Sequence, residues 1–126
     1  MNQIILPVNS KIYLFRNTIF NISHFKNVHL NILVHKQSQE FVNNIIKILS
    51  FFPNLNNTLY VDSSSENLSE LINNYVNKHN IKNFFRLDNG DICHPRRFLL
   101  TISNKPISFS NSILCYEKKK TKNTKI

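Results

Sequence analysis

Apolar residues alternate with other residues between positions 28 and 34 of this chain. Val28, Leu30, Ile32 and Val34 fall on one side of an extended backbone, and a period of two is typical of a half-buried β-strand. The two histidines that share the opposite parity, His29 and His35, are expected to face solvent.

The spacing of apolar residues then changes from two to three and four. This helical period runs from about Ser38, a plausible N-cap, to residue 52. Pro53 ends the predicted helix because proline lacks a backbone N–H. Residues 58–62 are rich in β-formers and predict a short strand after a loop.

A second helix is expected after this strand. Ser63 and Glu66 have the spacing of a capping box, in which a hydroxyl and a carboxylate satisfy backbone amides of the first turn. The apolar residues of segment 68–76 then recur with the helical period.

The third part of the pattern predicts a β-hairpin. Residues 84–87 and 98–102 read as its two strands, and the turn between them contains Asn89 and Gly90, the only glycine of the chain. Asn-Gly favours a tight hairpin because both residues accept a positive φ angle. Residues 112–116 are candidates for a last edge strand.

The N-terminal part has a weaker pattern. Residues 11–15 and 18–22 read as two short strands with a turn between them. The sequence therefore predicts a single small α+β domain: a mixed β-sheet covered by two helices, in the order strand, helix, strand, helix, strand, strand. We expect an N-terminal extension with a possible hairpin over residues 1–27, the domain over 28–117, and a basic C-terminal tail over 118–126.

The composition changes the picture of where the gene resides. The chain of 126 residues contains 21 Asn and 16 Ile, but no Ala, no Trp and one Gly. Because alanine is the best helix former and glycine the default turn residue, the requirements of a fold do not explain these proportions. Codons rich in adenine and thymine do explain them, and organelle genomes, parasites and reduced bacteria commonly show such a bias.

Candidate chemistry is sparse. Cys93 and Cys115 lack metal-ligand or redox spacing, although a disulfide between them stays open. One glycine cannot build a phosphate-binding loop or a nucleophile elbow. Asp62 and Glu66 fall at a helix entrance, and Asp88 and Asp91 flank a turn, so ordinary structural roles account for them. We therefore expect no enzyme, no metal and no cofactor.

Positive charge is the main functional cue. The formal net charge is +9, although lysine codons also accumulate in adenine-rich genes. His94-Pro95-Arg96-Arg97 is the most compact basic cluster, and arginine pairs bridge phosphates in a fixed geometry. Two exposed arginines that protect an edge strand are the alternative interpretation. The predicted RNA-binding residues are Arg96, Arg97, Lys105, Lys118, Lys119, Lys120, Lys122 and Lys125.

From Ser38 to about Tyr116, the order of elements and several spacings resemble the family of small-subunit ribosomal protein eight. The segments that carry the resemblance are residues 58–72, 80–84, where Asn80 stands at a usual glycine, 97–102, and the Asn-Lys-Pro-Ile of 104–107. The family's C-terminal half, with its Ser-Thr-Ser-Lys-Gly loop, has no counterpart after Tyr116. The resemblance implies a component of an organellar ribosome that contacts ribosomal RNA and neighbouring proteins.

These observations predict a structural component of a mitochondrial ribosome, in the small subunit, encoded by the organelle and located in the matrix. The start of the chain shows no secretion or import signal, and no apolar run approaches the length of a membrane span. The alternative is a peripheral subunit of a respiratory or ATP-synthase complex, with Phe41, Phe51 and Phe52 as anchors. A small enzyme is the third hypothesis, and it requires carboxylates that converge in a cleft.

Overall fold

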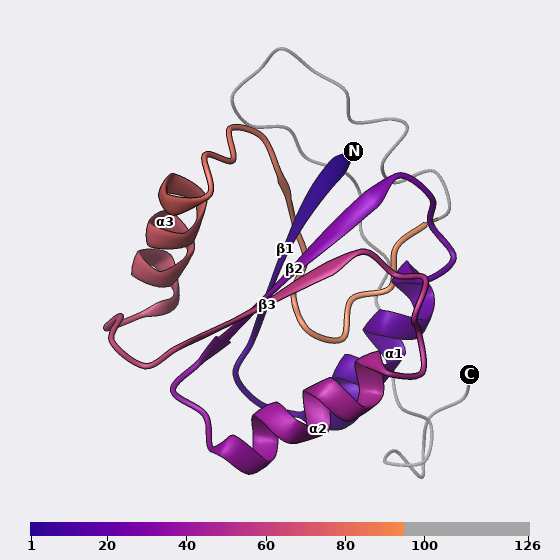
Figure 1. The fold of residues 1–126 in the computed structure, drawn as a ribbon, viewed down its shortest axis with the longest axis horizontal. Helices are drawn as coiled ribbons and strands as arrows, with labels where there is room; N and C mark the ends of the chain where they lie inside the picture. The colour runs from indigo at the N-terminus through magenta and orange to yellow at the C-terminus, as the bar shows by residue number, and fades with distance from the viewer. Residues whose placement is uncertain (95–126) are drawn as a thin grey trace, which may run out of the picture.

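The fold is a parallel β-sheet with helices on both faces (Figure 1). The structure, a computed structural model, describes residues 1–94. Its elements are β1 (Asn2–Val8), α1 (Ile12–Ile22), β2 (Val28–His35), α2 (Gln39–Leu49), β3 (Asn57–Asp62), α3 (Leu68–Lys78) and β4 (Phe85–Arg86). The strands lie in the order β3-β2-β1-β4, and all three described pairings are parallel.

Each face of the sheet packs against its own helices. Ile4, Leu6 and Val8 of β1 point to one side, where they join a core with residues of α1 and α2. Ile5 points to the other side and packs with residues of α3. Figure 1 shows the strands between α3 and the pair α1 and α2. Since both faces are covered, β1 buries the consecutive apolar residues Ile4, Ile5 and Leu6 rather than an alternating pattern.

The expectation of a single small domain with a sheet covered by helices is confirmed, and so are three of its elements. The predicted strands over 28–34 and 58–62 are β2 and β3, and the helix between them is α2, which ends at Leu49 rather than at residue 52. Ser38 is its N-cap, and its Oγ accepts a hydrogen bond from Phe41 N at 3.2 Å. Two details differ within residues 1–94: the strand pairs are parallel rather than mixed, and there are three helices rather than two.

The two short strands predicted over residues 11–22 are wrong, because this segment forms α1. Phe15, Ile19 and Ile22 are fully buried at a helical spacing of four and three. Aromatic and β-branched residues suggested strands, but their burial against the sheet overrides that preference.

Residues 2–8 form β1 in the middle of the sheet, between β2 and β4, rather than part of an extension. Pro7 is compatible with this position. The Ile5 carbonyl accepts from Leu87 N at 2.9 Å, so it points toward the β4 side of β1. The nitrogen of Pro7, two residues further along the strand, points to that same side. The two-residue β4 does not reach that point, and no ladder hydrogen bond is lost.

The capping box predicted at Ser63 and Glu66 is wrong in position. The N-cap of α3 is Asn67, whose Oδ1 accepts from Glu70 N at 2.9 Å. Glu70 Oε2 in turn accepts from Glu66 N at 3.2 Å. The serines upstream form a separate turn around Asp62, and this turn delays the start of the helix.

The first half of the predicted hairpin forms β4 and the turn that follows. Gly90 has the expected positive φ, 101°, but Asn89 does not, so this is not the predicted Asn-Gly hairpin turn. Asp91 N donates to Asp88 O at 3.0 Å. The second hairpin strand at 98–102, the edge strand at 112–116 and the tail at 118–126 lie outside the described residues.

Candidate functional site

The topology marks the carboxyl ends of the strands as the first place to search for a site. The chain runs from β1 through β2 to β3 on one side and then crosses to β4 on the other side of β1. Ligands of open α/β sheets bind outside the carboxyl ends of the strands, at the point where the strand order reverses. Here that point lies between β1 and β4.

The chain itself occupies this reversal point. Asn89 Nδ2 donates to Ser10 O at 3.0 Å and to Lys11 O at 3.1 Å, directly before α1. Gly90 N donates to Thr18 Oγ1 at 2.8 Å. A Cβ on Gly90 would approach Leu14 to 3.2 Å. Along the carboxyl ends of the strands, the accessible part is therefore at the ends of β2 and β3.

Asp62 organises the turn at the end of β3. One carboxylate oxygen accepts from the N and Oγ of Ser64 at 3.0 and 2.7 Å. The other accepts from the N and Oγ of Ser65 at 3.2 and 2.5 Å. Hydrogen bonds from the Ser64 and Ser65 side chains, together with those from their backbone amides, hold the pKa of Asp62 far below its usual value. The four acceptor positions of this carboxylate are already used.

The end of β2 is tied to both neighbouring strands. His35 Nε2 lies 2.7 Å from Ser65 O and donates to it, because a carbonyl oxygen only accepts. Lys36 has φ 52° and its N donates to Asp62 O at 3.1 Å. Gln37 Nε2 donates to Asn9 O at 2.6 Å. We call residues 9–11, 35–37 and 62–65 the carboxyl edge, a polar rim that is already ordered without a ligand.

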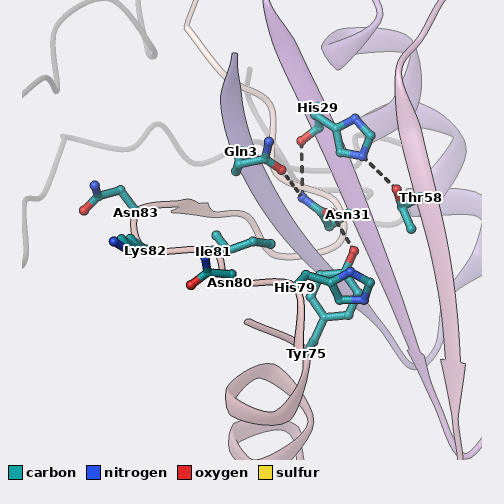
Figure 2. Close-up of a pocket in the computed structure, with 10 residues that line it drawn as sticks. All are labelled: Gln3, His29, Asn31, Thr58, Tyr75, His79, Asn80, Ile81, Lys82 and Asn83. Carbon is teal, nitrogen blue, oxygen red and sulfur yellow. Dashed lines mark hydrogen bonds between the residues drawn. The ribbon is translucent and has the colours of Figure 1, made fainter. Parts of the chain in front are cut away.

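A second polar site lies at the opposite, amino end of the strands (Figure 2). It is a pocket of about 370 Å³. Tyr75 OH donates to Asn31 Oδ1 at 2.6 Å, and Asn31 Nδ2 donates to Gln3 Oε1 at 2.9 Å. His29 Nε2 lies 2.8 Å from Thr58 Oγ1. Figure 2 shows this network on one side of the pocket and residues 80–83 on the other.

Burial shifts the titration of two groups in this pocket. It lowers the pKa of His29, because the imidazolium loses water more unfavourably than the neutral ring. It raises the pKa of Tyr75 for the corresponding reason, since the phenolate is the charged form. Near neutral pH, His29 and Tyr75 are therefore uncharged groups that act as hydrogen-bond donors and acceptors.

The expectation that His29 and His35 face solvent is wrong. His35 is 9% exposed and His29 is half-buried, because α3 covers the face to which both belong. Sequence reasoning also missed Asn31, Tyr75 and the pocket. Asn31 is only 2% exposed although it is polar, and the position of an amide within β2 was the available signal.

The predicted structural roles of the acidic residues hold at two places. Asp62 caps the turn before α3, and Asp91 Oδ2 accepts from Asp88 N at 2.9 Å within the turn after β4. Among residues 1–94, no three His, Cys, Asp or Glu side chains are close enough together to hold a metal ion.

All predicted RNA-binding residues lie outside the described part of the chain. This holds for Arg96, Arg97, Lys105 and the five lysines between 118 and 125, and Cys115 lies there as well. Cys93 is buried, and its N donates to Asn21 Oδ1 at 2.8 Å. Of the proposed protein anchors, Phe51 is exposed, whereas Phe41 and Phe52 pack partly against the core. In residues 1–94, no helix has the length and apolarity needed to cross a bilayer.

No protein-family model matches the chain, and no curated protein matches it in sequence. In structure it is similar to a mannosyltransferase from Pyrobaculum calidifontis, solved in complex with GDP-Man and Mn²⁺. The TM-score is 0.65 and the identity 14%, and the match covers 77% of this chain and 29% of the mannosyltransferase. At this identity the likeness concerns the fold.

This likeness overturns the expectation that the chain is not an enzyme. That expectation rested on missing glycine-rich loops, yet an enzyme with the same strand and helix arrangement exists. The manganese of that enzyme does not fit the residues described here, because no cluster of three ligands is present among them and the Asp62 oxygens are already occupied.

Proposed function

We propose that residues 1–94 form a sugar-nucleotide-binding domain of the glycosyltransferase kind, with its site at the carboxyl edge. The observation that carries the proposal is the likeness of this parallel sheet to a mannosyltransferase in complex with GDP-Man. Because the chain spans 29% of that protein, the proposal concerns binding of the donor nucleotide rather than a complete transfer reaction.

The geometry of the carboxyl edge supports this assignment. Lys36 is exposed beside the Asp62 turn, where its cation can pair with a diphosphate. The serine turn and the Gln37 bridge hold three strand ends in place before any ligand arrives, and such order lowers the entropy cost of binding. No step through a metal ion is part of the proposal.

Nuclear magnetic resonance of the isotope-labelled full chain tests the proposal. We expect GDP-mannose or UDP-glucose to shift the amide signals of residues 35–37 and 62–65, whereas free mannose leaves them unchanged. Lys36→Gly keeps the positive φ angle available and removes the cation, so it should weaken binding about fivefold. Lys47→Ala, which removes an exposed lysine of α2, is the matched control. If millimolar sugar nucleotide left the carboxyl edge unshifted, the proposal would be rejected.

A second candidate function is contact with ribosomal RNA in a mitochondrial ribosome. The supporting observation is the charge of residues 95–126, which hold eight of the sixteen basic residues and one of the seven acidic ones. Arg96, Arg97 and Lys105 belong to this group. RNA binding through such residues weakens steeply with salt because it releases counterions. Sedimentation with ribosomal particles supports this candidate, and sedimentation with a membrane complex supports the accessory-subunit alternative instead.

A further inference from the structure

The sheet face beneath α3 carries polar side chains that the opposite face lacks. Gln3, His29, Asn31 and Thr58 share this face with the buried Ile5 and Leu33 of the α3 core. On the other face of β1 and β2, all positions except Asn2 at the start of β1 are apolar and buried. Polar groups stabilise a covered sheet less than apolar groups do. Packing alone therefore does not account for the four polar side chains at the amino end of the strands.

The hydrogen-bond network of the pocket leaves several polar groups available. Gln3 Oε1 accepts from Asn31, but Gln3 Nε2 has no hydrogen-bond partner within residues 1–94. The same holds, within that range, for the side chains of Asn80 and Lys82 on the other side of the pocket. Within residues 1–94, the available groups are therefore the amide nitrogen of Gln3, the primary amide of Asn80 and the cation of Lys82.

The pocket also has an aromatic wall. The His79 ring lies on the Tyr75 ring with their centroids 4.2 Å apart and their planes tilted by 35°. His79 also contacts the Tyr60 ring edge to face, with centroids 6.3 Å apart, and remains exposed, so part of its ring is accessible to a ligand. Lys78 Nζ lies 5.4 Å from the centroid of Tyr60, close to the same cluster.

We propose that this pocket binds a nucleobase, either of a free nucleotide or of a single-stranded RNA. Primary amides present a donor and an acceptor side by side, which matches the edge of a base. Bases also stack on histidine and aromatic rings, and lysines pair with the adjacent phosphates.

The lining argues against a neutral sugar. Among residues 1–94, no aspartate or glutamate lines the pocket, so a ligand rich in hydroxyl donors would meet no charged acceptor from this part of the chain. Its volume of about 370 Å³ lies within the range of small-molecule sites. Because the pocket is at the amino end of the strands, the inference does not rest on the function proposed for the carboxyl edge.

The test is a titration of the isotope-labelled full chain with adenosine monophosphate, uridine monophosphate and ribose 5-phosphate. We expect both nucleotides to shift the side-chain amide signals of Gln3 and Asn80, and ribose 5-phosphate to leave them unchanged. His79→Ala, which removes the stacking ring, should weaken nucleotide binding about tenfold.

Two further variants probe the other side of the pocket. Asn80→Gly removes the amide at a position with φ 53°, where glycine is unstrained, so the variant folds. We expect it and Lys82→Ala each to weaken binding about fivefold. Asn44→Ala and Lys47→Ala make the same kinds of change on exposed positions of α2 and should bind normally.

Oligonucleotides of five adenines or five uridines distinguish the two sources of the base. Binding more than tenfold tighter than the mononucleotide, and sensitive to His79→Ala, indicates single-stranded RNA; equal binding indicates a free nucleotide. The proposal is overturned if ribose 5-phosphate shifts the same signals, if the shifts fall only on residues 95–126 or on the carboxyl edge, or if His79→Ala binds like the natural chain.

Discussion

Removal of the Tyr75 hydroxyl is the most direct test of the buried polar network. Tyr75 is 1% exposed and its OH donates to Asn31 Oδ1 at 2.6 Å, while Asn31 itself is 2% exposed. Tyr75→Phe keeps the ring, and with it the packing against Leu71 and Ile72, but leaves the buried amide oxygen without this donor. An unsatisfied buried acceptor costs about 1–3 kcal/mol.

Urea denaturation followed by circular dichroism measures this cost. We expect Tyr75→Phe to lower the free energy of unfolding by about 2 kcal/mol, with a fall in Tm of about 8 °C or more for a domain of this size. Tyr60→Phe is the matched control, because Tyr60 is half-buried and its hydroxyl has no hydrogen-bond partner within residues 1–94. That variant should stay within about 0.5 kcal/mol of the natural chain.

A double-mutant cycle shows whether Asn31 is the partner that matters. Asn31→Leu removes the acceptor, so adding Tyr75→Phe to it should cost less than Tyr75→Phe alone. Equal losses for Tyr75→Phe and Tyr60→Phe, or additive losses in the cycle, would refute the idea that this hydrogen bond stabilises the core.

Three other predictions concern stability. Leu33→Ala should lower the free energy of unfolding by about 2–5 kcal/mol in a urea titration, because it opens a cavity in the α3 core; a loss below 1 kcal/mol would contradict the burial. Gly90→Ala should cost about 1 kcal/mol or more in the same assay, since φ is 101° and Leu14 lies 3.2 Å from the new Cβ; unchanged stability would contradict the turn. Asp62→Asn should cost about 1 kcal/mol at neutral pH through the lost turn. Because the pKa of Asp62 is lowered in the fold, its carboxylate stabilises the fold above the ordinary pKa of 3.8, and this stabilisation is lost as the pH falls below that value. The free energies of unfolding of the natural chain and the variant should therefore converge in acid. A difference between them that stays constant with pH would contradict the assignment.

The elements that sequence reasoning predicted share one property: their apolar residues recur with the regular spacing of a strand or a helix. The strand at 28–34 has apolar residues at every second position, and the helix after Ser38 has an N-cap followed by a regular stripe. Of the two parts that it missed, α1 has a helical spacing that was read as two strands, and β1 lacks a period. In β1, Ile4, Ile5 and Leu6 are all buried, because the strand is covered on both faces and needs no polar face.

The candidate sites were largely beyond the reach of sequence reasoning. The carboxyl edge joins His35 to Ser65 and Gln37 to Asn9, positions separated by about thirty residues. The pocket at the amino end joins Asn31 to Tyr75, which are 44 residues apart. No local spacing encodes such pairs, since they depend on which helix covers which face.

The sequence by itself determined where several elements begin and end, because caps, prolines and periods act over one or two turns of chain. Ser38 acts in this way at the start of α2, whereas α2 ends at Leu49, before the predicted stop at Pro53. Only the tertiary structure decided that β1 lies between β2 and β4 and that α3 lies opposite α1 and α2. The physical reason is that strand order and helix side are set by the burial of both sheet faces at once, a property of the assembled layers. Because α3 packs on this face of the sheet, His29 and Asn31 line a pocket instead of facing solvent.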